Sequence, residues 1–188
     1  MDQQTPINGV PGEFAPQSTV IYALHGKCLI TGIENRTIGA QTLRFYKLEV
    51  QKSALSRSSR QEPAIWVPVA SARDQGLRAP LTADEADTVL KTLSSREYFF
   101  QINESWSSIM PKLETCIKVE GGIGMAKVMS YLFVLKKKQV VPTPEVARFY
   151  ENVSKLLLRE LSEILNKPIR ALEDQIARGF RQKLLPDS

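Results

Sequence analysis

This chain of 188 residues is 43% hydrophobic and 24% charged, with a formal net charge of +5 at neutral pH, which is typical of one or two small globular domains. One histidine and two cysteines argue against a structural zinc site, which needs four ligands, and no metal or cofactor is expected. The longest apolar run, at 128–135, is too short to span a membrane. Cys28 and Cys116 match no metal-ligand spacing and are expected to be reduced thiols of a cytoplasmic protein.

The excess positive charge lies in the C-terminal part of the chain. Residues 1–111 carry 11 Lys/Arg and 11 Asp/Glu, whereas residues 112–188 carry 14 and 9. A neutral half beside a basic half suggests one module for a protein partner and one that lies near a polyanion. A merely soluble basic surface explains the charge equally well.

The N-terminal third predicts a flexible leader and a small sheet. Residues 1–17 are rich in Pro, Gly and Gln, lack the pattern of a signal peptide, and predict a disordered leader. The next fifty residues contain β-branched and aromatic runs separated by turn residues. These runs are STVIYAL, CLITGIE, QTLRFYKLEV and AIWVPV. Four or five such short strands predict a strongly bent, Tudor-like β-barrel, which we assign to residues 18–79.

After Pro80 the apolar residues recur about every 3.6 positions, which predicts helices. Thr82 and Glu85 have the spacing of a capping box at the first helix start. Further helices are predicted over 105–120, 124–138, 143–166 and from 167 onward, with two glycines at 121–122 as a stop and Thr143-Pro144 as a start. The predicted fold class is therefore α+β, with an all-α bundle over residues 80–188.

Enzyme motifs are missing from the sequence. It contains no G-x-S-x-G, P-loop or G-x-G-x-x-G pattern in the right context, and its acidic residues form no obvious inward-facing pair. The single histidine, His25, has no plausible nucleophilic partner, and it precedes Gly26 at what resembles a tight turn. A structural role for His25 is favoured over a catalytic one, and the protein is not expected to be an enzyme.

An ordered series of short segments resembles the RNA-polymerase-interacting domain of CarD/CdnL transcription regulators and transcription-repair coupling factors. The segments are VIY at 20–22, HG at 25–26, IENRTIG at 33–39, FYKL at 45–48, IWVPV at 65–69 and GLR at 76–78. The pattern that follows, an acidic helix, a Trp, a buried helix, a basic end and a long Leu-rich helix, is also similar. The resemblance covers roughly 18–185 and favours the CarD/CdnL family.

This resemblance implies a bacterial transcription regulator that is cytoplasmic, associated with the nucleoid through RNA polymerase, and usually monomeric. The barrel of the family binds the polymerase β subunit by laying a strand edge against it. The helical domain contacts promoter DNA at the upstream edge of the transcription bubble. There a Trp inserts into the minor groove and stabilises the open complex.

The resemblance also indicates which residues contact the polymerase. The family's polymerase-binding strand matches Arg36, Thr37 and Ile38, and Arg36 is the best candidate because its planar guanidinium can pair with a carboxylate. Where the family often has a second basic residue, this chain has Trp66. Trp66 either offers an aromatic anchor or packs into the barrel.

Trp106 aligns with the tryptophan that inserts into DNA, although packing into the bundle is the usual fate of such a residue. Ser107 and Ser108 stand where the family commonly has basic residues, which leaves Lys112 as the only nearby cation. The DNA contact is therefore expected to be weaker or shifted to other basic residues. The candidates are Lys118, Lys136, Lys137, Lys138, Arg148 and Lys155.

Two alternatives remain open from the sequence. The protein is either a complete regulator or a divergent, polymerase-binding adaptor without a functional DNA wedge. The polar segment at 53–63 is longer than the usual family hairpin. It either makes an extra contact or is an idle flexible loop, and the second is favoured.

Overall fold

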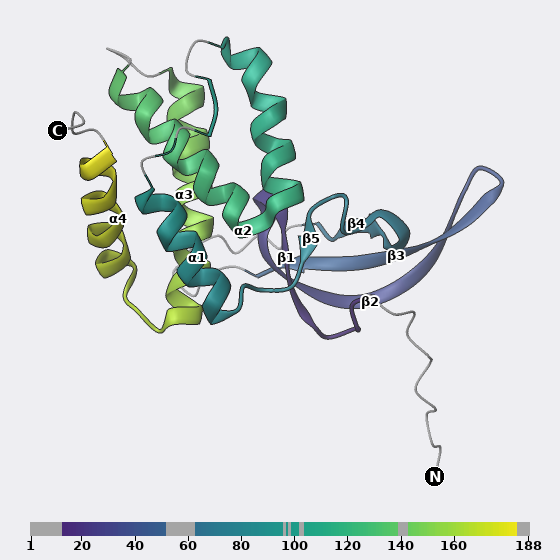
Figure 1. The fold of residues 1–188 in the computed structure, drawn as a ribbon. Coiled ribbons are helices and arrows are strands. Elements are labelled where there is room, and N and C mark those ends of the chain that lie inside the picture. Colours follow the sequence, from purple (N-terminus) through teal and green to yellow (C-terminus); the bar gives the residue numbers. More distant parts are fainter. Residues whose placement is uncertain are drawn as a thin grey trace.

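The computed structural model describes residues 13–51, 63–95, 97, 99–101, 104–138 and 143–183. Strands come first and helices second, so the predicted α+β class is confirmed (Figure 1). The predicted leader before residue 13 and nearly all of the segment 53–63 lie outside the described residues.

Five strands form one antiparallel sheet in the order β4-β3-β2-β1-β5. Their bounds are Thr19–Tyr22 (β1), Gly26–Ile38 (β2), Gln41–Val50 (β3), Ile65–Pro68 (β4) and Leu77–Arg78 (β5). The edge strands β4 and β5 contribute Val67 and Leu77 to the same buried cluster as Val20 of β1 and Leu48 of β3. A sheet whose two edges share a core is strongly bent, as predicted, and it encloses that core as a small barrel does.

Turn chemistry shapes the start of the sheet. A short 3₁₀ turn, η1 (Ala23–His25), joins β1 to β2, and Gly26 follows it with a φ of +77°, which glycine adopts readily. The His25 side chain is exposed, and its ring stacks on Tyr22 with 4.9 Å between the ring centroids.

Four helical elements follow the sheet: α1 (Ala83–Ser94), α2 (Trp106–Lys138), α3 (Pro144–Leu165) and α4 (Ile169–Lys183). The capping box of α1 is confirmed, because the Thr82 hydroxyl accepts a hydrogen bond from the Glu85 N–H and the Glu85 carboxylate accepts one from the Thr82 N–H. The predicted start of α3 is also confirmed, with the Thr143 hydroxyl as N-cap and Pro144 as its first residue. None of the described helices is long and apolar enough to cross a membrane.

The glycines at 121–122 interrupt α2, as predicted. Gly121 has a φ of +58° and a ψ of −124°, which is not helical. The chain reverses there, since Cys116 on the first half contacts Gly124 on the second, with 4.0 Å from the Cys116 sulfur to the Gly124 carbonyl oxygen. A Cβ at Gly124 would overlap the Cys116 carbonyl. The two halves of α2 therefore form a tight hairpin.

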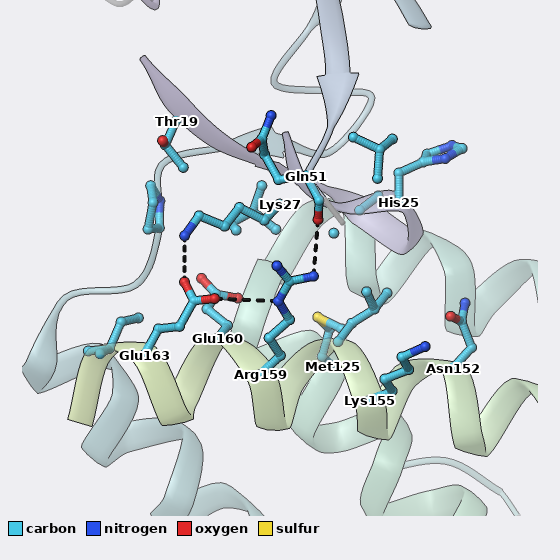
Figure 2. Close-up of a pocket in the computed structure, with 17 residues that line it drawn as sticks. Thr19, His25, Lys27, Gln51, Met125, Asn152, Lys155, Arg159, Glu160 and Glu163 are labelled. Carbon is cyan, nitrogen blue, oxygen red and sulfur yellow. Dashed lines mark hydrogen bonds and ion pairs between the residues drawn. The ribbon is translucent and has the colours of Figure 1, made fainter. Parts of the chain in front are cut away.

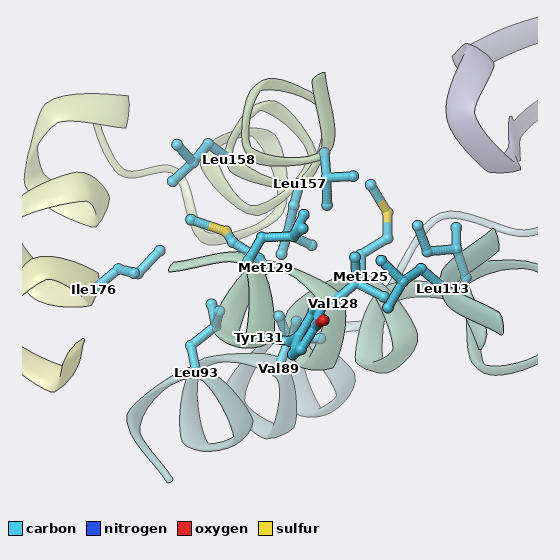
Figure 3. Packing of buried hydrophobic residues seen from close by; sticks show 14 of the residues in the cluster. Val89, Leu93, Leu113, Met125, Val128, Met129, Tyr131, Leu157, Leu158 and Ile176 are labelled. Atoms are coloured by element: carbon cyan, nitrogen blue, oxygen red, sulfur yellow. The ribbon is translucent and has the colours of Figure 1, made fainter. Parts of the chain in front are cut away.

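The helices share a hydrophobic core separate from that of the sheet (Figure 3). The second half of α2 contributes Met125, Val128, Met129 and Leu132, all nearly inaccessible to solvent, as expected for a helix whose apolar residues cover most of its circumference. Helical spacing in the sequence predicts a buried stripe on α3 at Val146, Phe149, Tyr150, Val153, Leu156, Leu157, Leu161, Ile164 and Leu165. Five of these residues are buried, whereas Tyr150, Leu156, Ile164 and Leu165 are only partly buried. Leu158 is also buried, although the stripe did not include it.

Polar contacts join the sheet to α3. The Arg78 guanidinium pairs with both carboxylate oxygens of Glu160, at 2.7 and 2.6 Å. Glu160 also accepts a hydrogen bond from the Leu81 N–H at 2.9 Å, and its side chain is only 7% exposed. Lys27 pairs with Glu163 at 2.6 Å on the same face of α3. The relative position of the two parts thus depends on charged groups.

Candidate protein-interaction surface and basic helical end

The predicted polymerase-binding residues lie at the far end of a long β2–β3 ribbon, which extends away from the helices (Figure 1). Ile38 pairs with Gln41 across a two-residue turn, and Gly39 in that turn has a φ of +61°. Arg36, Thr37 and Ile38 are all exposed, Ile38 by 59%. An apolar side chain so far from either core contributes little to folding and is available for a partner.

One edge of β2 is open along the outer part of the ribbon. β1 pairs with β2 only at its start, over Gly26–Leu29, and Ile30 bonds to residues just before β1. From Gly32 to Ile38, β2 pairs with β3 alone among the described residues. Every second residue of this stretch directs its N–H and C=O away from β3. These groups form a template for an added strand.

Side chains from three strands gather on one face of the ribbon, as the cross-strand pairs Arg36–Leu43, Gly32–Lys47 and Lys47–Trp66 show. We call this face the outer patch; it comprises Glu34, Arg36, Ile38, Leu43, Lys47 and Trp66. The Arg36 guanidinium carbon lies 3.5 Å from the centroid of the Trp66 ring, and the Lys47 nitrogen lies 5.6 Å from it. Trp66 is not part of the sheet core. It therefore does not pack into the barrel core, and its role as an aromatic anchor for a partner stays a prediction.

The charge of the outer patch is only partly neutralised. Lys47 is 4.0 Å from Glu34, whereas Arg36 has no carboxylate partner among the described residues. Stacking on an indole uses the face of a guanidinium and leaves its N–H groups in the ring plane free to donate. The patch therefore presents an aromatic platform and a cation available for a carboxylate.

Thr37 does not join the outer patch. It pairs with Thr42 on the opposite face of the ribbon, where the two hydroxyl oxygens are 3.2 Å apart. Arg44 is also on that face and pairs with Glu13 at 2.9 and 3.1 Å. Sequence analysis missed Leu43 and Lys47. A two-residue turn after Ile38 fixes the pairing of β2 with β3, and this pairing places Leu43 opposite Arg36.

Trp106 is the first residue of α2 and is half-buried against the helical core. Its ring meets the Phe149 ring edge-on, with 5.9 Å between centroids. Ser107 and Ser108 are exposed. Lys112 pairs with Glu104 at 2.7 Å, and this hydrogen bond holds the pKa of the Glu104 carboxyl below its usual value. The cation nearest to Trp106 in sequence is thus already paired.

Two further predicted cations lie at the other end of α2. Lys136, at the end of α2, lies 5.4 Å from the ring of Tyr150, which neighbours Phe149 on α3. Lys137 is exposed and lies 6.0 Å from the ring of Phe133. The side chain of Lys138 lies outside the described residues.

The predicted DNA-contacting residues therefore separate into two groups. Trp106, Lys112, Lys136 and Lys137 lie at one end of the helical region. Lys155 lies between one and two turns further along α3, at the mouth of a cavity that faces the sheet. The sequence predicts Lys155 only as a candidate DNA contact, because helical periodicity does not reveal a cavity formed with the sheet.

No cluster of three or more His, Cys, Asp or Glu suited to a metal ion occurs in the described part of the chain. Cys28 is buried in the sheet and forms no disulfide with Cys116. Burial and the charge of Glu120 raise the pKa of the Cys116 thiol to about 11, so it is protonated and a poor nucleophile at neutral pH. A scan of protein-family models and a search of curated proteins gave no match to this chain.

Proposed function

We propose that this protein is a bacterial transcription regulator of the CarD/CdnL type, which binds the β subunit of RNA polymerase through the β2–β3 ribbon. The observation that carries the proposal is the open edge of β2 from Gly32 to Ile38, which ends in the Arg36-Thr37-Ile38 sequence. Main-chain hydrogen bonds along this edge would supply affinity for a strand of the partner, and the adjoining side chains would select it.

The outer patch supports recognition of a partner that carries a carboxylate. Arg36 stacks on Trp66 at 3.5 Å, so its guanidinium is held in one place before the partner arrives and loses less side-chain entropy on binding. An exposed Ile38 beside it adds an apolar contact. In this chain Trp66 would therefore act through Arg36, and a second basic residue is not needed at that position.

The basic end of the helical region supports contact with promoter DNA near the transcription bubble. Trp106 is half-buried against Phe149 of α3, and Lys136 of α2 lies over the ring of Tyr150, the next residue of α3. For this ring to enter the minor groove, the gain at the base step must exceed the loss of its contact with Phe149 and an unstacking cost of about a few kcal/mol. Phosphate contacts from Lys136 and Lys137 would contribute to that gain.

A second candidate function is a polymerase-binding adaptor that makes no DNA wedge. The contact of Trp106 with Phe149 and the pairing of Lys112 with Glu104 favour it. Both observations reduce what this end of the molecule offers to DNA. The two candidates share the ribbon and differ only in the role of Trp106.

Binding to purified polymerase β subunit tests the shared part of the proposal. Arg36→Glu is expected to weaken binding by more than about tenfold, because it places a negative charge opposite the partner carboxylate. Arg36→Gln and Arg44→Gln form a matched pair on opposite faces of the ribbon, and only the first should weaken binding. If the wild-type chain does not bind, or Arg36→Glu binds equally well, the proposed contact is wrong.

The lifetime of a promoter open complex separates the two candidates. A regulator that uses the wedge should lose its effect on this lifetime with Trp106→Ala while keeping its affinity for polymerase. An adaptor should show no change. Circular dichroism and a Trp106→Phe variant control for folding, since phenylalanine preserves an edge-on contact with Phe149.

A further inference from the structure

A cavity of about 480 Å³ lies in the joint between the sheet and α3 (Figure 2). The start of the sheet forms one wall, and α3 and Met125 of α2 form the other. This volume is in the range of small-molecule sites, which often occur where two parts of a protein meet. The cavity lies at the opposite end of the sheet from the outer patch, so neither proposed contact uses it.

Apolar side chains form much of the cavity wall. They come from four elements and are Ile21, Val50, Met125, Leu156 and Ile164. Leu156 lies so close to Gly26 that a Cβ at that glycine would come within 2.6 Å of its Cδ2 atom. Glycine at this position therefore lets α3 approach the sheet, and the approach closes the cavity on that side.

The carboxylates at the cavity are already paired. Glu160 is held by Arg78 and the Leu81 N–H. Glu163 is held by Lys27 at 2.6 Å and lies 3.4 Å from Arg159. Burial alone would raise the pKa of Glu163, but Lys27 and then Arg159 outweigh burial and lower the pKa. Neither carboxylate is thus available to hold a cationic ligand.

The remaining hydrogen-bonding capacity of the cavity mouth is mostly that of donors. Lys155 and Asn152 project there from α3 (Figure 2), and neither has a partner among the described residues. Arg159 donates from Nη1 to the Gln51 carbonyl at 3.0 Å and from Nε to Glu163 at 3.4 Å, and its Nη2 group has no partner among the described residues. Two cations whose hydrogen-bond donors are not all used, beside an apolar wall, favour a molecule with a negative head and an apolar body.

We propose that this cavity binds a small amphiphilic anion, with its carboxylate or phosphate at Lys155 and Arg159 and its apolar part against Met125 and Leu156. Because the walls belong to both parts of the molecule, the ligand stabilises their docked arrangement by mass action. It thereby links the concentration of a small molecule to the relative placement of the ribbon and the helical end.

Methionine methyl groups provide a direct test by NMR. The full chain, labelled with ¹³C at the methionine methyls, is titrated with octanoate or octyl phosphate below their micelle concentrations, and with octylamine as the cationic control. The Met125 resonance, assigned with Met125→Leu, should shift saturably with at least one of the two anions, and Met110 should not shift. The two anions distinguish a carboxylate ligand from a phosphate ligand, and octylamine should give no saturable shift.

Lys155→Glu should weaken binding of the preferred anion by about tenfold or more, because it replaces a charge-assisted donor with a repulsive charge. Lys91→Glu is the matched control, since Lys91 is an exposed lysine on α1 away from the cavity. The affinity of this variant for the anion should stay within about twofold of wild type. The proposal is overturned if neither anion shifts Met125, if octylamine shifts it equally, or if Lys155→Glu binds like wild type. Folding of both variants is checked on the same spectra.

Discussion

The two tryptophans of this chain lie in contrasting surroundings, one on the sheet and one at the start of a helix. Trp66 lies outside the sheet core, with a guanidinium 3.5 Å from its ring. Trp106 packs against the helical core and meets Phe149 edge-on. The sheet presents its tryptophan with a cation held against it, whereas the helical region uses its tryptophan in part to complete a core.

This difference follows from how each part buries its apolar surface. A bent sheet has a concave face for its core and a convex face that stays exposed, so residues alternate between the two. A helical bundle encloses one large core, and a tryptophan at a helix start near the surface contacts both this core and the solvent. The sheet is therefore the better supported interaction surface.

The largest expected effect comes from breaking the joint between the two regions. Glu160→Ala leaves Arg78 and the Leu81 N–H without their partner in a site where the carboxylate is only 7% exposed. The free energy of unfolding should fall by about 3 kcal/mol. Urea denaturation measures this as a lower midpoint. Glu163→Gln is the matched control on the same helix, and it should cost less than about 1 kcal/mol because that side chain is 43% exposed.

The next prediction compares the loss of stability when each tryptophan is replaced by alanine. Trp106→Ala should lower the free energy of unfolding by about 2 kcal/mol, since it removes a half-buried ring from the helical core. Trp66→Ala should cost about 1 kcal/mol or less, because it mainly removes a contact with an exposed arginine. Equal losses in chemical denaturation would contradict the contrast between the two sites.

A third experiment sharpens the role of Trp66 in binding. If Trp66 positions Arg36, the variants Arg36→Ala and Trp66→Ala should not be additive in their effects on affinity for polymerase β. The double-mutant cycle should give a coupling free energy of roughly 0.5–1 kcal/mol. The control cycle combines Leu43→Ala with Arg36→Ala, because Leu43 is a neighbour of Arg36 in the outer patch but does not stack on Trp66. Additive effects for Arg36 and Trp66 would mean that they contact the partner independently.

Local signals made most of the fold predictable from sequence. The Thr82–Glu85 capping box, the stop at Gly121 and the Thr143-Pro144 start each depend on residues within one turn of one another, and all three are confirmed. Runs of β-branched and aromatic residues between turn residues similarly predicted the strands. Such features require no knowledge of what lies elsewhere in the chain.

The candidate sites were less predictable because they depend on contacts between distant segments. Arg36 and Trp66 are thirty positions apart in the chain, and their contact requires both the register of β3 and the bend of the sheet. The cavity beside Lys155 requires α3 to dock on the sheet through Glu160. Periodicity predicts which face of an element is exposed but not what lies opposite that face.

The smallest expected effect comes from the capping box of α1. It is a pH-dependent change in the free energy of unfolding. Hydrogen bonds from the backbone and then the side chain of Thr82 lower the pKa of Glu85, so folding favours its ionised form. Its stabilising contribution is complete above the ordinary carboxyl pKa and is lost as the pH falls through the lowered value. Glu85→Gln should therefore reduce the free energy of unfolding by roughly 0.5 kcal/mol at neutral pH, because the carboxylate is largely exposed, and this difference should shrink as the pH falls below the ordinary carboxyl pKa. Thermal unfolding of both proteins from pH 3 to pH 7 measures it, with Asp87→Asn as the control on the same helix. A difference that stays constant over this range would show that the charge of Glu85 does not stabilise the capping box.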